Sequence, residues 1–370
     1  MNIGNKAWRS IWLGEDGCSV GVIDQRKLPH VFKTKTLRTW QDAADAIKSM
    51  VVRGAPLIGV TGAYGLMLAL QSDATDKALN IAIKNLMATR PTAVNLRWAL
   101  ERMRKAVFLL PQSERAEAAK REVGLIVAED VACCDAIGTY GLSILQKLAE
   151  DKCLKGEDLP IQILTHCNAG WLATVDWGTA LAPIYKAFRK GVNLHVWVDE
   201  TRPRNQGASL TSYELGCEGI PHTVIVDNAG GYLMQNNQVD LVLVGTDRTT
   251  KTGDVCNKIG TYLKALAAYD NNIPFYVALP ISTIDWSIKE GLAEIPIEIR
   301  SENEVKQIPG RLLSLNGGVD IASVKLVPDF AKTFNPAFDI TPARLVTAFI
   351  TDKGILAATE EGLEAIYSCS

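Results

Sequence analysis

Short apolar runs that alternate with helix-length intervals are the feature that most restricts the fold of this chain. Beyond residue 155, such runs are found at 161–166, 194–199, 223–227, 239–247 and 275–280, with a late candidate at 324–328. Each of the earlier intervals leaves room for a helix, and continuous apolar runs are typical of strands that are buried on both faces. The pattern predicts βαβ units and a mostly parallel sheet covered by helices.

The first 150 residues have a helical periodicity instead. Helices are expected at 41–50, 59–69, 77–88 and 94–109, and a long one at 112–150 that is interrupted around Gly138 and Gly141. A change of pattern in a chain of 370 residues predicts two domains. With the polar segment 152–158 as the linker, we predict a mainly helical N-terminal domain at 1–151 and an α/β domain at 152–370.

Charge and cysteine usage argue against several classes of protein. The 39 Lys and Arg residues nearly balance 41 Asp and Glu residues, which gives no reason to expect a nucleic-acid or membrane-surface partner. We expect no signal peptide, and no apolar run long enough to span a bilayer. The eight cysteines are scattered without zinc-like spacing, which favours free thiols in a reducing compartment, so the cytoplasm is expected.

Two of the predicted strands bring chemically active side chains to their carboxyl ends. The run at 161–166 is followed by Cys167 and Asn168, and the run at 239–247 ends in Asp247. Because the carboxyl ends of parallel strands face one crevice, the thiol and the carboxyl are expected to lie close together. Such a pair suggests acid–base chemistry on a small molecule.

Each strand-end group also has a purely structural explanation. A cysteine at a strand end is usually a small buried hydrophobic residue. Asp247 is about as well explained by helix capping or by pairing with Arg248 as by catalysis. Asp199, Glu200 and Asp227 lie where the N-caps of following helices belong.

Two segments of the α/β domain have the composition of ligand-binding loops. DETRPRNQG combines acids and arginines with Pro and Gly at turns, and it contains Gln206. GDVCNKIG is expected to open a helix with Asp254 as its N-cap. That arrangement would put Asn257 and Lys258 in the first turns, where amide donors and an ammonium group suit a phosphate.

Two segments of the N-terminal domain carry an arginine close to a helix. In VVRGAPLIGVTGAYG, Arg53 precedes Gly54 and Ala55, so the backbone can approach a ligand closely just before a helix begins. In TRPT, Arg90 precedes a proline. An ordinary exposed cation explains either arginine equally simply.

Taken together in this order, the segments closely resemble the methylthioribose-1-phosphate isomerase family. The resemblance is carried by VVRGAPLIGVTGAYG, TRPTAVNL, ILTHCNAG, VWVDETRPRNQGASLTSYEL, VDLVLVGTDR, GDVCNKIGTY, IPFYVALPISTID and NPAFDITPARLVTAFITDKGIL. It implies a helical N-terminal domain, a Rossmann-like C-terminal domain, a homodimer, and neither a metal nor an organic cofactor. The wider family includes ribose-1,5-bisphosphate isomerase and the regulatory subunits of a translation-initiation exchange factor.

The resemblance also implies an activity and a set of site residues. The family converts 5-methylthioribose 1-phosphate, an aldose, into the ketose 5-methylthioribulose 1-phosphate in methionine salvage. The catalytic thiol of the family matches Cys167, and its catalytic acid matches Asp247. The substrate-contacting positions match Arg53, Gly54, Ala55, Arg90, Gln206, Asn257 and Lys258.

The chemistry of such a substrate requires both an acid and a base. Phosphate on O1 blocks spontaneous ring opening, so we expect a protonated Asp247 to open the ring and a Cys167 thiolate to move a proton from C2 to C1. A direct hydride shift is the competing path. Burial is expected to keep Asp247 un-ionised, while His166 or the phosphate-binding cations support the thiolate.

Three questions stay open at the level of sequence. A non-catalytic regulatory subunit would need neither Cys167 nor Asp247, and a ribose-1,5-bisphosphate isomerase would need further cations for its second phosphate. Trp171 follows the thiol motif where the family commonly has a small residue. It either packs in the core or reshapes the pocket, in which case 5-deoxyribose 1-phosphate becomes an additional or the main substrate.

Overall fold

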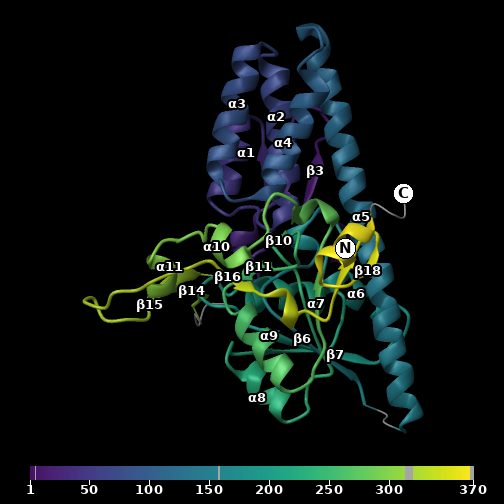
Figure 1. Ribbon diagram of the computed structural model, residues 1–370. Helices are drawn as coiled ribbons and strands as arrows, with labels where there is room; N and C mark the ends of the chain where they lie inside the picture. Colours follow the sequence, from purple (N-terminus) through teal and green to yellow (C-terminus); the bar gives the residue numbers. More distant parts are fainter. Residues whose placement is uncertain (5, 157–158, 313–319, 367–370) are drawn as a thin grey trace.

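A helical domain and an α/β domain lie end to end, and one long helix, α5 (Gln112–Leu154), runs along both of them (Figure 1). The computed structural model describes residues 1–4, 6–156, 159–312 and 320–366. The predicted fold class, a mainly helical N-terminal domain followed by a Rossmann-like, mostly parallel sheet domain, is confirmed.

The N-terminal core forms around the apolar helix α2. The helices of this domain agree with the predicted ones: α1 (Trp40–Lys48), α2 (Ala55–Ser72), α3 (Asp76–Thr89) and α4 (Val94–Val107). The prediction missed an antiparallel sheet that precedes these helices in the chain, made of β3 (Ile11–Leu13), β4 (Val20–Ile23) and β5 (Thr34–Leu37). Apolar residues of this sheet complete the same core.

By length and hydropathy alone α2 is able to cross a membrane, which corrects the expectation that no apolar run is long enough. However, 83% of this stretch is buried inside the protein. Its small residues serve close packing, since a Cβ atom at Gly59 would lie 2.8 Å from the carbonyl oxygen of Asn95 in α4. The burial and the packing are those of the central helix of a domain core.

Helix α5 is continuous over 43 residues, so the predicted interruption at Gly138 and Gly141 is wrong. A side chain at Gly141 would collide with Pro183 of the neighbouring helix α6 (Leu181–Arg189), which shows that close packing explains this glycine. The helix contributes to the cores of both domains, and therefore the boundary at 151/152 stays a prediction. Residues 157–158 of the predicted linker lie outside the described residues.

A seven-stranded sheet organises the α/β domain. Its strands lie in the order β18 (Gly354–Leu356), β17 (Ala348–Thr351), β12 (Phe275–Ala278), β9 (Leu241–Val244), β6 (Ile161–Thr165), β7 (Leu194–Asp199), β8 (His222–Ile225). All neighbouring pairs are parallel except β17 with β18. The first five predicted runs became β6, β7, β8, β9 and β12.

The sixth predicted run, 324–328, is wrong as a strand of this sheet. Ile321–Lys325 is β15, which pairs with β14 (Gln307–Arg311) in a hairpin that projects from the body of the molecule (Figure 1). A second, four-stranded sheet was also missed: β13 (Ile284–Asp285), β10 (Arg248–Thr250), β11 (Val255–Lys258) and β16 (Phe338–Thr341).

Helices cover both faces of the large sheet. Helix α6 and helix α7 (Ser212–Cys217) share one apolar core with α5, whereas α8 (Ala229–Gln235) and α9 (Thr261–Asp270) share the core on the other face. The remaining short elements are β1 (Asn2–Ile3), β2 (Lys6–Ala7), α10 (Gly291–Glu294), α11 (Asn303–Lys306) and α12 (Glu360–Glu364).

The strand order reverses between β6 and β9. From β6 the chain moves outward through β7 and β8, and then returns to β9 on the other side of β6. A reversal of this kind opens a crevice beyond the carboxyl ends of the two strands beside it. Cys167 and Asp247 follow the carboxyl ends of these two strands.

Candidate functional site

Cys167 and Asp247 line one small cavity of about 30 Å³ at the reversal point of the sheet. The thiol is buried, with 8% of the residue exposed, while Asp247 is half-buried. Neither structural explanation of Asp247 holds: a strand, β10, follows it, and Arg248 contacts the carbonyl oxygen of Thr92 and, at 3.6 Å, the Asp285 carboxylate. The predicted proximity of the thiol and the carboxyl therefore agrees with the geometry.

The backbone of Cys167 adopts the left-handed conformation, with φ = 68°. This conformation is unfavourable for a residue with a side chain, and such strain is found mainly where the surroundings hold it. The Cys167 N–H donates to Thr201 Oγ1 at 2.8 Å, and the Cys167 carbonyl accepts from Thr211 Oγ1 at 2.7 Å. The Cys167 thiol donates to Gln206 Oε1 at 3.0 Å, which joins two predicted site residues.

The Arg53–Gly54–Ala55 segment lines the same cavity. Arg53 is buried rather than an exposed cation, and its Nη2 donates to the carbonyl oxygen of Asn168 at 2.7 Å. Gly54 has φ = 97°, and a Cβ atom there would lie 2.5 Å from Ala173 Cα, so no other residue fits without displacement of that backbone. Helix α2 begins directly after it and has no side-chain cap.

Asn257 and Lys258 lie on strand β11, so the prediction that GDVCNKIG opens a helix is wrong. The Asp254 carboxylate does not cap a helix there; it accepts from the N–H groups of Gly291 and Ala343, both at 3.0 Å. Successive residues of a strand point to opposite faces. Consistently, Asn257 lines the cavity of Cys167, while Lys258 lines a neighbouring cavity together with Gln206.

Arg90 lies at the border of the site in an ion pair. A third small cavity contains Arg90 together with Ala55 and Asp247. The Arg90 Nη2 atom is 2.9 Å from Glu298 Oε2, and Glu298 also pairs with Arg300 at 2.7 Å. A phosphate that binds Arg90 therefore competes with a carboxylate of the α/β domain.

Two cations counteract the burial of the thiol. Burial raises the pKa of Cys167, whereas the charges of Arg53 and Lys258 lower it and that of Asp247 raises it further. Burial likewise lowers the pKa of both Arg53 and Lys258, and the nearby Cys167 and Asp247 oppose this shift. Arg53 and Lys258, rather than His166, are thus the cations that favour a Cys167 thiolate.

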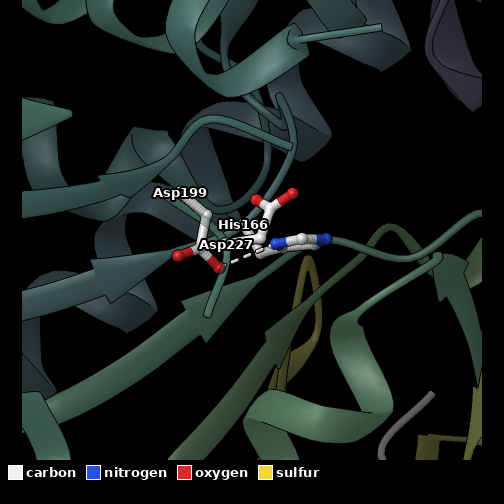
Figure 2. A group of neighbouring side chains, drawn as sticks. All are labelled: His166, Asp199 and Asp227. Carbon is white, nitrogen blue, oxygen red and sulfur yellow. Dashed lines mark hydrogen bonds and ion pairs between the residues drawn. The ribbon is translucent and has the colours of Figure 1, made fainter. Parts of the chain in front are cut away.

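His166, which also lines the cavity of Cys167, forms a cluster with buried Asp199 and half-buried Asp227, shown in Figure 2. Its Nδ1 lies 2.8 Å from Asp199 Oδ2, and its Nε2 lies 2.8 Å from the carbonyl oxygen of Ile259. These three side chains have the spacing of a metal site. The Lys264 ammonium group lies 3.2 Å from the same Asp199 oxygen and supplies positive charge to the cluster.

The capping explanation of Asp199 and Asp227 is wrong. Asp199 pairs with His166 and Lys264, and the Asp227 carboxylate accepts from the N–H groups of Thr201 and Arg202 at 2.7 and 2.8 Å. These contacts shape the predicted DETRPRNQG loop, in which the Arg202–Pro203 peptide is cis. The loop holds Gln206 against Cys167.

Three polar residues near the site were missed by the sequence reasoning: Asn168, Tyr185 and Glu214. All three are buried; Asn168 and Tyr185 each donate a hydrogen bond to Glu214, and Asn168 also binds Arg53. Their signal was the presence of polar side chains in apolar surroundings in the THCNAG, APIYK and SYEL motifs. Trp171, in contrast, has no exposed surface and packs in the core that α5, α6 and α7 share with the large sheet.

A larger cavity of about 850 Å³ lies between α2, α4, α5 and the loop after β12. None of the nine predicted site residues lines it. The smaller cavities at the reversal point of the sheet are therefore the candidate active site, because the reactive and charged groups converge there.

Comparisons with known proteins agree with this arrangement. A family model described as the initiation factor 2 subunit family matches residues 51–358. The methylthioribose-1-phosphate isomerase of Methylocella silvestris is 56% identical over 367 residues, which cover 99% of this chain and 98% of that protein.

Two solved structures also resemble the chain over nearly its full length. The 5-methylthioribose 1-phosphate isomerase from Pyrococcus horikoshii superposes with a TM-score of 0.81 at 37% identity, covering 99% of this chain and 97% of that one. The translation initiation factor eIF-2B subunit delta from A. fulgidus has a TM-score of 0.78 at 36% identity, covering 98% of this chain and 100% of that one.

Proposed function

Because the chain belongs to the initiation factor 2 subunit family, in the group of methylthioribose-1-phosphate isomerases, we propose that it converts 5-methylthioribose 1-phosphate into 5-methylthioribulose 1-phosphate in methionine salvage. One observation carries the assignment of the site. A buried thiol, Cys167, and a carboxyl group, Asp247, line a single cavity beside the buried guanidinium of Arg53.

The substrate phosphate binds at the positive end of this site. Arg53 and the uncapped N-terminus of α2 at Gly54 and Ala55 lie on one side, and such helix ends attract anions. Asn257 donates from β11, and Lys258 and Gln206 act from the adjoining cavity. Arg90 joins them by exchanging the Glu298 carboxylate for the phosphate.

The reaction is an acid–base cycle between two residues. Asp247 donates its proton to the ring oxygen, the bond from C1 to that oxygen breaks, and C1 becomes a phosphorylated cation. The Cys167 thiolate removes the proton from C2, which leaves a double bond between C1 and C2. The thiol then returns this proton to C1 while Asp247 accepts the proton of the C2 hydroxyl group, so both residues end as they began.

Charge near the thiol supports this role. The reaction needs one proton on Asp247 and none on Cys167, although burial alone raises the pKa of the thiol. Arg53 and Lys258 act against that shift, and closing the cavity over a substrate strengthens both interactions because water is removed. In a hydride shift, the hydrogen would move directly from C2 to C1, and only Asp247 would exchange protons with the sugar.

Several narrower assignments follow from the family and from the site. Trp171 lies in the core, which removes the reason to prefer 5-deoxyribose 1-phosphate, so the methylthio compound is the main substrate. The names of the relatives favour an isomerase over a non-catalytic subunit. The resemblance supports a homodimer, and seven free cysteines among the described residues suit the cytoplasm.

A substrate panel with site variants tests the proposal. The purified chain is given ribose 1-phosphates that carry methylthio, hydrogen or phosphate at C5, and the methylthio compound is expected to have the highest kcat/KM. Cys167→Ser and Asp247→Asn should each lower kcat by about 100-fold or more, whereas the control Cys133→Ser, a half-buried thiol of α5, should not. Near-normal turnover in either site variant refutes its assigned role.

A further inference from the structure

Glu214, on α7, is a fully buried carboxyl group that the reaction itself does not use. Its Oε1 atom accepts from Asn168 Nδ2 at 2.8 Å and from the Leu172 N–H at 3.1 Å. Its Oε2 atom accepts from the Trp171 N–H at 2.8 Å and from Tyr185 Oη at 2.5 Å. All four partners are donors in this arrangement, which matches an ionised carboxylate, since a carboxylate only accepts.

The approach of this carboxylate accounts for the small residue in the THCNAG motif. A Cβ atom added at Gly170 would collide with Glu214 Oε2. The loop between β6 and the Trp171–Ala173 turn therefore wraps around the carboxylate. Charge-assisted hydrogen bonds of this kind are stronger than neutral ones, so they fix the loop firmly.

Asn168 transmits this fixation to the active site. Because its Nδ2 group donates to Glu214, its Oδ1 atom is turned towards Arg53 and accepts from Arg53 Nη1. Arg53 Nη2 donates to the Asn168 backbone carbonyl, and Thr211 Oγ1, which accepts from Asn168 Nδ2 at 3.2 Å, donates to the Cys167 carbonyl. The orientation of one amide thus sets the positions of both Arg53 and Cys167.

We propose, on the basis of the proposed isomerase function, that Glu214 is a positioning residue: its carboxylate holds the Asn168 amide in the orientation that clamps Arg53 beside Cys167, and Tyr185 stabilises the carboxylate. A proton on Glu214 adds an O–H among the four donors that already surround the carboxyl group. The hydrogen bonds that hold the Asn168 amide then weaken, and the clamp on Arg53 loosens.

The surroundings of Glu214 bring its protonation close to neutral pH. Burial raises the pKa of Glu214 to about 7, against the hydrogen bonds from Tyr185, Asn168 and Leu172 and the charge of Arg53. The other ionisable groups on α7 or in contact with it or with Tyr185 include Arg189, Tyr213, Cys217 and Glu218. Since the ionised form is the competent one, activity should be lost as pH falls through about 7.

Removal of the tyrosine hydroxyl group tests the proposal without removing the carboxylate. Tyr185→Phe takes one donor from Glu214, so the acid limb of kcat against pH should move upward by about 0.5 to 1 pH unit. The matched control is Tyr64→Phe, another buried tyrosine, which lies in the core of the helical domain. Its acid limb should coincide with that of the wild-type chain.

A change of the carboxyl group itself gives a second, independent readout. Glu214→Gln puts an NH2 group against donors, so kcat should fall at least tenfold and the acid limb near pH 7 should disappear, whereas Glu214→Asp should keep an acid limb. If the limb of Tyr185→Phe coincides with that of Tyr64→Phe, or Glu214→Gln keeps the limb, the positioning role is wrong. Absence of turnover in the wild-type chain instead refutes the isomerase proposal on which this inference rests.

Discussion

The Arg90–Glu298 ion pair predicts that removal of an acidic residue improves substrate binding. Both side chains are half-buried, 12% and 21% exposed, and their nearest atoms lie 2.9 Å apart. Burial by itself raises the pKa of Glu298, but Arg90 and Arg300 hold this pKa below its ordinary value, so the residue is ionised at neutral pH. A phosphate that needs Arg90 must break this interaction first.

The size of the effect follows from the burial of the pair. Exposed ion pairs contribute about 0 to 1 kcal/mol, and breaking a fully buried pair costs about 3 to 5 kcal/mol, so about 1 kcal/mol is a reasonable value for this half-buried pair. Glu298→Gln should therefore lower KM about fivefold, because about 1.4 kcal/mol corresponds to a factor of ten. The fold should persist, since Arg300 keeps its interaction with Glu304 at 2.7 Å.

Steady-state kinetics on the isomerase substrate measure this effect. The matched control is Glu302→Gln, which removes an exposed carboxylate of the same segment that pairs with Lys306. Its KM should stay within a factor of two of the wild-type value, as expected for a surface ion pair. A KM for Glu298→Gln that is unchanged or higher would show that Arg90 does not exchange Glu298 for the phosphate.

Three further predictions test the geometry of the site. Gly54→Ala should lower the free energy of unfolding by about 3 kcal/mol or more, measured with urea, since the new Cβ meets the Ala173 backbone at a positive φ; an unchanged stability would show that the backbone has room. Lys264→Met should cost about 3 to 5 kcal/mol because it leaves the buried Asp199 carboxylate without its cation. Lys251→Met, at a pair whose side chains are about one third exposed, should cost far less, and equal losses would contradict the argument. Over many reversible turnovers in D2O, the proton path predicts deuterium at C1 of the product, and its complete absence would establish a hydride shift.

The sequence predicted five of the seven strands of the large sheet but missed β17 and β18, and four of the five, β6, β7, β9 and β12, are mostly buried. Each such strand is a short continuous apolar run, and the reversal of strand order brings the ends of β6 and β9 together. The proximity of Cys167 and Asp247 could therefore be expected from the sequence alone. The choice of the remaining substrate contacts depended on the family resemblance.

The errors have a common physical cause: pairing between distant segments. Strand β11, with the sequence VCNK, has no apolar run of its own and exists because it pairs with β10 and with β16, which begins at Phe338. The same polar segment, judged locally, fits the first turns of a helix. Polarity and glycine content alone thus favoured the wrong local structure.

The role of Glu214 could not be read from its neighbours along the chain. Its hydrogen-bond donors come from the loop around Asn168 and Trp171 and from Tyr185 on α6, all roughly 30 to 45 residues earlier. A lone acid in the apolar SYEL segment was the available signal. Only the fold shows that four donors converge on it.

A crystal structure of Cys167→Ser with the ketose phosphate bound is the most direct test of the central arrangement. The sugar should lie between the two residues, with the residue-167 hydroxyl within about 3.5 Å of C1 or C2 and an Asp247 oxygen at hydrogen-bond distance from a sugar oxygen on the opposite side. The phosphate should contact Arg53. A product that occupies the larger interdomain cavity, or that has both residues on one side of the sugar, would contradict the proposed mechanism.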